Sequence, residues 1–293
     1  MGQVHHAASG WRGTLALAAV LMLAACQPSN GAGETAAPSA ERPMRIVSLD
    51  YCADQYLLRL ADREQILAIS PDGPRDFSYM RAAARGIPTV RPVAEDVMVL
   101  EPDLVIRTYG GGPNAEGFFE RAGIPVLQIG YATTVDGAGM GSIPQLVIDV
   151  AAGLGHPERG TELATDYRNR LAALERRSQA GSALYMTAGG VTTGPGSLVH
   201  EMLLAAGLRN FEEQPGWHSL PLERLAYDQP DIVAAAFFAS RFNYDDMWSA
   251  SQHPIARRLL ETRETVALDG AWTACGGWFI LDAIEALAEE AGS

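Results

Sequence analysis

Apolar residues along the chain follow two periods, which predict alternating strands and helices. Short apolar runs at 45–49, 66–70, 103–108 and 123–129 are typical of buried parallel strands, and further strands are expected at 183–187, 231–235 and 265–268. Apolar residues recur at helical spacing in 52–61, 142–154 and 279–291. The polar, Arg/Glu-rich segment 157–179 is expected to form a helix of about six turns. The pattern therefore predicts an α/β fold.

One phrase of the sequence occurs twice. Segment 95–105 (EDVMVLEPDLV) recurs at 223–233 (ERLAYDQPDIV), with a constant offset of 128 residues. Each copy predicts a short helix that ends before a proline and is followed by a buried strand. Two copies on either side of one long helix favour two α/β lobes joined by that helix. The alternative is an internal duplication of one βα unit that does not imply two lobes.

The N-terminus predicts an export signal. Residues 15–25 form an uncharged apolar run, too short for a bilayer span of about 20 residues but suited to a signal peptide. The run ends in Leu-Ala-Ala before Cys26, which resembles the lipobox of bacterial lipoproteins. The resemblance implies a signal peptide at 1–25 and lipidation of Cys26; an ordinary secretory signal is the alternative. Residues 26–43 are rich in Pro, Gly, Ser and Ala and indicate a flexible tether.

The charge balance excludes several classes of protein. All 22 basic residues are arginine, against 35 Asp and Glu, and the net charge is −13. The absence of lysine excludes Schiff-base, P-loop and kinase-type lysines. An acidic chain also lacks the basic face of a nucleic-acid binder. Removal of 1–25 takes away only Arg12 and leaves the mature chain at −14, from 21 arginines and 35 acidic residues.

Taken together, these features resemble the helical-backbone periplasmic substrate-binding proteins of ABC importers for ferric siderophores, haem and vitamin B12. The resemblance rests on the lipobox, the tether, the RIVSL strand at 45–49, the repeated phrase and the long helix between its copies. It covers 44–293 and implies a class III periplasmic binding protein: two Rossmann-like lobes, at 44–141 and 182–293, joined by linking helices at 142–181, of which one is long. It further implies a monomeric, non-catalytic receptor that holds its ligand between the lobes.

The resemblance also implies partners. Glu95 and Glu223 match the glutamates with which the family docks onto arginine pockets of the membrane permease, and carboxylates accept such bidentate hydrogen bonds. The alternative is that each glutamate is merely favoured in the first turn of a helix by the helix dipole. The lipid would hold the chain on a bacterial membrane, inner or outer, on its periplasmic side.

Ligand contacts are expected just after strands, because open α/β sheets bind ligands at the carboxyl ends of their strands. Aromatic side chains there suit flat, rigid ligands, although ordinary packing explains each one equally well. Trp272 aligns with a cleft tryptophan of the B12-binding branch. The strongly acidic mature chain favours a neutral chelate such as cobalamin over an anionic ferric siderophore. The candidate cleft residues are Tyr51, Cys52, Phe77, Tyr79, Tyr109, Trp217, Arg241 and Trp272.

Two cysteines remain after Cys26. Cys52 and Cys275 both follow expected strands, one in each lobe, and either pair as an inter-lobe disulfide or lie as free thiols near the ligand. Of the two, we expect unpaired thiols close to the cleft.

Other functions are less well supported by the sequence. A haem receptor uses the same fold, and a direct Zn/Mn receptor would need clustered ligands, whereas the four histidines of the mature chain are isolated. A hydrolase is disfavoured because no Gly-x-Ser-x-Gly is present, and Ser197 is expected to be a helix N-cap instead. We therefore expect no resident metal or cofactor; the metal belongs to the bound chelate.

Overall fold

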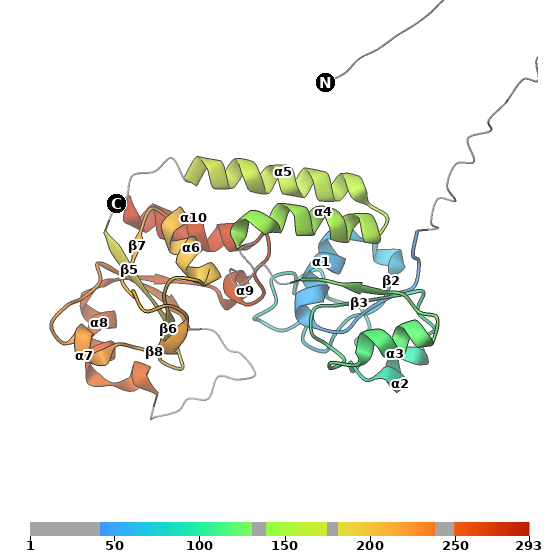
Figure 1. Ribbon diagram of the computed structural model, residues 1–293, viewed down its shortest axis with the longest axis horizontal. Helices are drawn as coiled ribbons and strands as arrows, with labels where there is room; N and C mark the ends of the chain where they lie inside the picture. Colours follow the sequence, from blue (N-terminus) through green and yellow to red (C-terminus); the bar gives the residue numbers. More distant parts are fainter. Residues whose placement is uncertain (1–41, 131–138, 175–180, 238–248, 293) are drawn as a thin grey trace, which may run out of the picture. The chain divides into compact units, whose positions relative to one another are not determined.

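Two parallel four-stranded sheets form the framework of the protein. The computed structural model describes residues 42–130, 139–174, 181–237 and 249–292. The sheets have the strand orders β2-β1-β3-β4 and β10-β9-β5-β7, and each is the base of one lobe (Figure 1). The expected signal peptide, most of the tether, Cys26 and Arg241 lie outside the described residues.

Lobe 1 is built on the first sheet and the linking region follows it. In chain order lobe 1 contains β1 (Ile46–Ser48), α1 (Tyr51–Leu60), the 3-10 turn η1 (Arg63–Gln65), β2 (Ile66–Ala68), α2 (Ala94–Met98), β3 (Leu104–Arg107), α3 (Ala115–Arg121) and β4 (Val126–Gln128). The linking region contains η2 (Met140–Ser142), α4 (Ile143–Gly153) and α5 (Pro157–Leu174).

Lobe 2 is built on the second sheet and carries an additional antiparallel pair, β6 with β8. Its elements are β5 (Ser182–Thr187), β6 (Val191–Thr193), α6 (Leu198–Ala205), β7 (Arg209–Asn210), β8 (Trp217–Ser219), α7 (Leu222–Leu225), β9 (Ile232–Ala236), η3 (Ala250–Gln252), α8 (Pro254–Thr262), β10 (Glu264–Ala267), α9 (Gly270–Thr273) and α10 (Ile280–Ala291).

The strands and helices expected from apolar periodicity are confirmed. So are the short helix before each proline of the repeat, α2 and α7, and the N-cap at Ser197, whose hydroxyl accepts from the backbone N–H of His200. The linking helix was expected to reach residue 179; α5 ends at Leu174, and 175–180 lie outside the described residues. Strands β6 (VTT), β7 (RN) and β8 (WHS) were not expected, because these short segments contain polar residues and no apolar run that would mark a buried strand.

The central strands of each sheet, β1 and β3 in lobe 1 and β5 and β9 in lobe 2, are buried on both faces, and alternate side chains enter different hydrophobic clusters. In lobe 1, Ile46 and Ile106 join a cluster shared by both lobes, whereas Val47 and Val105 face a local cluster against α2 and α3. In lobe 2, Leu184 and its neighbours face a second local cluster. This alternation follows from the two-residue period of a strand.

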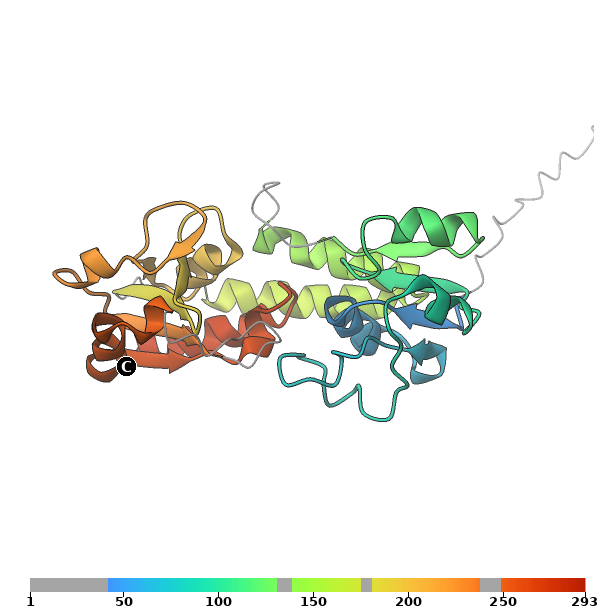
Figure 2. The same cartoon turned by 90° about the horizontal axis from the view of Figure 1, so that it is seen from below.

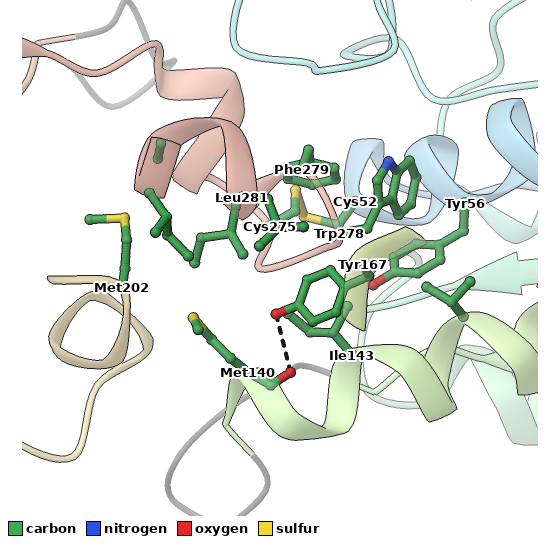
Figure 3. Packing of buried hydrophobic residues seen from close by; sticks show 14 of the residues in the cluster. Cys52, Tyr56, Met140, Ile143, Tyr167, Met202, Cys275, Trp278, Phe279 and Leu281 are labelled. Carbon is green, nitrogen blue, oxygen red and sulfur yellow. Dashed lines mark hydrogen bonds between the residues drawn. A yellow bond between two sulfur atoms is a disulfide. The ribbon is translucent and has the colours of Figure 1, made fainter. Parts of the chain in front are cut away.

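The shared cluster runs through the two linking helices. Helix α4 packs along α5, and Gly160 permits their close approach, because a Cβ there would lie 2.6 Å from Cβ of Ala151. Figure 3 shows Ile143 of α4 and Tyr167 of α5 among cluster residues from both lobes, with the Tyr167 hydroxyl donating to the carbonyl of Met140 at 3.2 Å. The linking helices therefore belong to the core and are not a free tether.

Helix α5 is bonded to a different lobe at each end. Near its N-terminus, Arg159 donates to Asp62 at 2.6 Å and to the carbonyl of Leu60 at 2.8 Å in lobe 1. Near its C-terminus, Arg170 donates to Glu285 at 2.8 and 2.9 Å and to Asp282 at 2.7 Å, both on α10. Figures 1 and 2 show α5 running from one lobe to the other, consistent with these contacts.

A disulfide also joins the lobes, and our expectation of two unpaired thiols is wrong. Cys52 in the first turn of α1 is bonded to Cys275, which lies between α9 and α10 (Figure 3). Their Cα atoms are 5.3 Å apart, within the range that a disulfide requires. The sequence could not show this, because the residues are separated by 223 positions.

Within the residues that the structure describes, none of the helices has the length and apolar character needed to cross a membrane.

The disulfide predicts a measurable contribution to stability. Replacing Cys52 and Cys275 together by alanine should lower the free energy of unfolding by about 2–5 kcal/mol, because the long loop that they close is then released in the unfolded chain. Denaturant titration of the mature chain, carrying Cys26→Ser, measures this. Reductant should destabilise the parent and leave the double variant unchanged. Two reactive thiols counted in the denatured, unreduced parent would contradict the assignment.

Candidate functional site

The first turn of α1 organises the loop that follows β3. Asp50, the N-cap of α1, is buried and accepts from the backbone N–H of Ala53 at 2.9 Å. Its other oxygen accepts from the backbone N–H groups of Thr108, Tyr109 and Gly110 at 2.7–3.0 Å. A single carboxylate therefore caps a helix and fixes the backbone of an expected ligand residue, Tyr109.

Two further contacts define the same loop. Arg107 is buried and donates to the carbonyls of Tyr109 and Gly112 at 3.1 and 3.0 Å. These two hydrogen bonds hold the backbone of the loop in place. Gly110 lies so close to β1 that a Cβ there would collide with the carbonyl of Leu49. A glycine is therefore required at this position on steric grounds.

Three of the expected aromatic residues come together at this end of lobe 1. The ring of Tyr51 lies edge-on to Phe77, with 5.0 Å between centroids, and edge-on to Tyr109, at 6.4 Å. Tyr51 and Phe77 are partly buried, and Tyr109 is exposed. These rings, from three separate segments, form a continuous aromatic surface, which suits a large rigid ligand.

Buried polar residues of α1 hold the long loop that carries Phe77 and Tyr79. Asp54 accepts from the hydroxyl and the backbone N–H of Ser70, at 2.6 and 3.2 Å. Gln55 donates to the hydroxyl of Ser78 at 2.9 Å and accepts from the backbone N–H of Met80 at 2.7 Å. The loop is thus tied to the same helix end that positions Tyr51.

Tyr79 lies in the contact between the lobes. Its ring stacks on Phe279 of α10 at 4.7 Å, and its hydroxyl donates to Asp282 at 2.8 Å. Burial, together with this hydrogen bond, raises the pKa of Tyr79 to about 12. Asp282 also accepts from Arg170, so that lobe 1, α5 and α10 meet at one carboxylate. We call Cys52, Tyr79, Cys275, Phe279 and Asp282 the lobe junction.

The expected tryptophans belong to lobe 2. Trp217 lies in β8, is exposed, and has its ring edge-on to Tyr185 of β5 at 6.0 Å. Trp272 lies in α9, partly buried against the shared cluster.

The structure thus divides the candidate cleft residues into groups. Tyr51, Phe77 and Tyr109 gather in lobe 1, while Trp217 and Trp272 lie in lobe 2. Cys52 and Tyr79 join the lobes, and the disulfide leaves Cys52 without a thiol to offer to a ligand. Arg241 lies outside the described residues.

Asp54, Gln55, Phe279 and Asp282 were not expected at the site. Their partners lie on other segments, which only folding brings close. A signal for the first two existed: a charged residue and an amide stand next to each other in a helix that is otherwise apolar on its buried side, and both are fully buried. Such residues usually have a specific partner.

Glu95 and Glu223 are exposed carboxylates in the first turns of α2 and α7. Within the described parts of the chain, neither carboxylate forms a hydrogen bond or an ion pair; only the backbone carbonyls of these residues accept hydrogen bonds. The nearest arginines in sequence are engaged elsewhere. Arg91 pairs with Asp96 at 2.6 Å, and Arg224 donates to Asp228 at 3.0 Å and lies 4.0 Å above the ring of Phe211.

The aspartates of the repeat differ from the glutamates, because their carboxylates accept hydrogen bonds from other residues of this chain. Asp103 accepts from the backbone N–H groups of Met44 and Arg45 at 2.8 and 2.9 Å, just before β1. Asp231 accepts from the backbone N–H and the hydroxyl of Ser182, in β5, at 2.7 and 2.8 Å, and these bonds hold its pKa below the usual range. Each aspartate connects the start of its own strand to the neighbouring strand.

A cavity of about 500 Å³ lies between α1 and α5, apart from the expected ligand residues. It is lined by Arg59, Leu60, Arg159, Glu162, Leu163 and Asp166. Its arginine Arg159 is already bonded to Asp62. Among the described residues, no group of three or more His, Cys, Asp or Glu side chains is arranged to hold a metal ion.

Comparison of the sequence with known families and proteins gives two results. A family described as periplasmic binding protein matches residues 46–250. A cobalamin-binding protein of Halobacterium salinarum is 25% identical over 222 residues, which cover 72% of this chain. The match covers only 59% of that relative's length.

Solved structures share the fold. A periplasmic haem-binding protein from Pseudomonas aeruginosa superimposes with a TM-score of 0.62 and 23% identity, over 85% of this chain and 92% of that one. The periplasmic vitamin B12 binding protein BtuF of Vibrio cholerae gives 0.60 and 21%, over 86% and 97%. At these identities the likeness concerns the fold alone: two α/β lobes in the class III arrangement expected from the sequence.

The buried carboxyl of Asp54 predicts a pH-dependent stability. Burial, only partly offset by hydrogen bonds from Ser48 and Ser70, raises the pKa of Asp54 to about 7. The folded chain therefore retains a proton that the unfolded chain releases above about pH 4, and stability should fall as the pH rises from about 4 to 7. Asp54→Asn should remove this part of the pH dependence, measured by denaturant titration at several pH values. Asp76→Asn, at an exposed position of the loop that carries Phe77 and Tyr79, is the control. An unchanged slope in Asp54→Asn would contradict the assignment.

Proposed function

The chain belongs to the periplasmic binding protein family, and on that premise we propose that it is the substrate-binding lipoprotein of an ABC importer. It captures a metal chelate between its lobes and delivers the chelate to the permease. The family consists of binding proteins and not of enzymes, so the ligand is released chemically unchanged. ATP is consumed by the partner subunits.

The observation that carries the proposal is the pair of glutamates, Glu95 and Glu223, whose carboxylates have no partner among the described residues. Both lobes present an exposed carboxylate at the same position of the repeat, and in both the neighbouring arginine is occupied by an aspartate. Free carboxylates, one in each lobe, supply two points of charge recognition, which fix the orientation of a partner as well as its affinity.

Cobalamin is the ligand that we favour. The Halobacterium relative is named a cobalamin-binding protein, and the acidic surface of this chain disfavours strongly anionic chelates. We assign the ligand contacts to Tyr51, Phe77 and Tyr109 in lobe 1 and to Trp217, Arg241 and Trp272 in lobe 2. Rings from both lobes would cover the faces of a corrin, and arginine would meet any carboxylate or phosphate.

The expected location follows from the N-terminus. Lipidation at Cys26 would hold the chain on a bacterial membrane, and the tether at 26–43 would let the folded lobes reach both free ligand and permease in the periplasm.

Ligand titration tests the first half of the proposal. Cyanocobalamin added to the mature chain should quench tryptophan fluorescence with a Kd of micromolar or tighter, and Trp217→Phe or Trp272→Phe should reduce the quench. Haem, a neutral ferric siderophore and an anionic one are the alternative ligands. If one of these binds instead, the choice of cobalamin is wrong. If none of the four binds at micromolar concentration, the proposed function is wrong.

Docking tests the second half. Glu95→Gln and Glu223→Gln should each weaken binding to the host permease–ATPase complex in nanodiscs by about tenfold, and together by about a hundredfold, with a weaker dependence on salt. Ligand affinity should not change. Glu158→Gln, an exposed glutamate on α5, is the matched control. Wild-type docking by the double variant, with normal ligand binding, would overturn the docking assignment.

A further inference from the structure

Two apolar side chains stand out by their exposure. Val99 is 80% exposed and Tyr227 is 82% exposed, whereas the other exposed large apolar residues among those described range from 39% to 58%. Single exposed apolar residues are common on protein surfaces and need no explanation by themselves. The positions of Val99 and Tyr227 in the sequence, however, do need an explanation.

Val99 and Tyr227 occupy the same position of the repeat. They are 128 residues apart, the offset that also separates Glu95 from Glu223. The most exposed large apolar side chain of each lobe therefore lies four residues after the free glutamate of that lobe. Elsewhere in the repeat, shared positions serve the same purpose in both lobes, as the paired roles of Asp103 and Asp231 show.

The local backbone brings each apolar residue next to its glutamate. In α2, the backbone N–H of Val99 donates to the carbonyl of Glu95 at 3.4 Å, which completes one helical turn. At α7, Ala226 N–H donates to Glu223 and Tyr227 N–H donates to Arg224, at 3.3 and 3.1 Å. Residues four apart share a face on the α-helical turn of Glu95 and Val99, whereas the bonds at α7 join residues three apart, so Tyr227 follows Glu223 by just over one tighter turn. We call Glu95 with Val99 the lobe 1 patch, and Glu223 with Tyr227 the lobe 2 patch.

We propose that Val99 and Tyr227 are the apolar half of two equivalent docking patches for the permease, an inference that rests on the proposed function. In each patch an apolar side chain would enter a recess of the partner while the adjacent carboxylate receives a cation. Interfaces combine apolar contact at the centre with polar contact at the rim, and tyrosine is enriched in them.

The two patches lie where a single partner can contact both. Both lobes offer a carboxylate and an apolar side chain in the same order along the chain. Figure 1 shows α2 and α7 at the same edge of the two lobes, opposite α5, where one membrane-facing partner can reach both.

A second copy of this chain is a poorer occupant. Self-association through the patches would bring free carboxylates against free carboxylates, in a chain whose net charge is −13. Like charges facing each other oppose association. A permease that supplies arginine or lysine at these places has no such cost.

Matched substitutions test the inference. Val99→Ser and Tyr227→Ser should each weaken binding of the mature, ligand-loaded chain to the permease–ATPase complex in nanodiscs by about five- to tenfold. The larger effect is expected for tyrosine, because it buries more area. The losses should appear as faster dissociation with an unchanged salt dependence, in contrast to the slower association expected for the glutamate variants. Leu204→Ser on α6, a residue that is 43% exposed, is the control and should bind as the wild type does.

The outcomes separate this inference from the function on which it rests. If the glutamate variants dock poorly while both serine variants dock within twofold of wild type, the apolar contact is wrong and the proposed function stands. If the wild type fails to bind the complex, the proposed function fails and the inference fails with it. A concentration-dependent dimer in analytical ultracentrifugation that Tyr227→Ser abolishes would assign the patch to a second copy and overturn the inference. Unchanged melting temperature and ligand affinity in both serine variants confirm that a loss belongs to docking.

Discussion

One hydrophobic core, continuous from lobe 1 through α4 and α5 to lobe 2, is the constraint on which the rest of the structure depends. It contains Cys52 and Tyr56 from lobe 1 and Leu281 from lobe 2 (Figure 3), while the outer face of each sheet packs into a cluster of its own. Separating the lobes would expose part of this core to water. The relative placement of the lobes is therefore restrained before any ligand binds. This restraint lowers the entropic cost of binding, because less conformational freedom remains to be lost.

The polar and covalent connections reinforce this restraint. Arg159 and Arg170 bond the two ends of α5 to different lobes, and the disulfide joins the first turn of α1 to lobe 2. That same turn holds the loop after β3 through Asp50 and the long loop through Asp54. The aromatic surface of Tyr51, Phe77 and Tyr109 thus depends on a helix end that is fixed on several sides.

The repeated phrase has a division of roles within it. The carboxylates of Asp103 and Asp231 accept hydrogen bonds that connect neighbouring strands. The carboxylates of Glu95 and Glu223 have no partner among the described residues. Under the docking proposal, the structural and the recognition roles of one motif therefore belong to different carboxylates. The exposed apolar residues at equivalent positions, Val99 and Tyr227, belong to the proposed recognition part.

The sequence by itself determined the features that depend on neighbouring residues: the buried strands, the long helices, the repeat with its short helices, and the N-cap at Ser197. Periodicity and capping are local, so they are visible before folding. It did not determine short strands without an apolar run, such as β7, nor whether Cys52 and Cys275 would be bonded. It did not show that Tyr79, one of the expected ligand residues, stacks on Phe279 and donates to Asp282 in the lobe junction. Only the tertiary structure decided these points, because distances between residues some 200 positions apart are set by how the lobes pack and not by the order of residues along the chain.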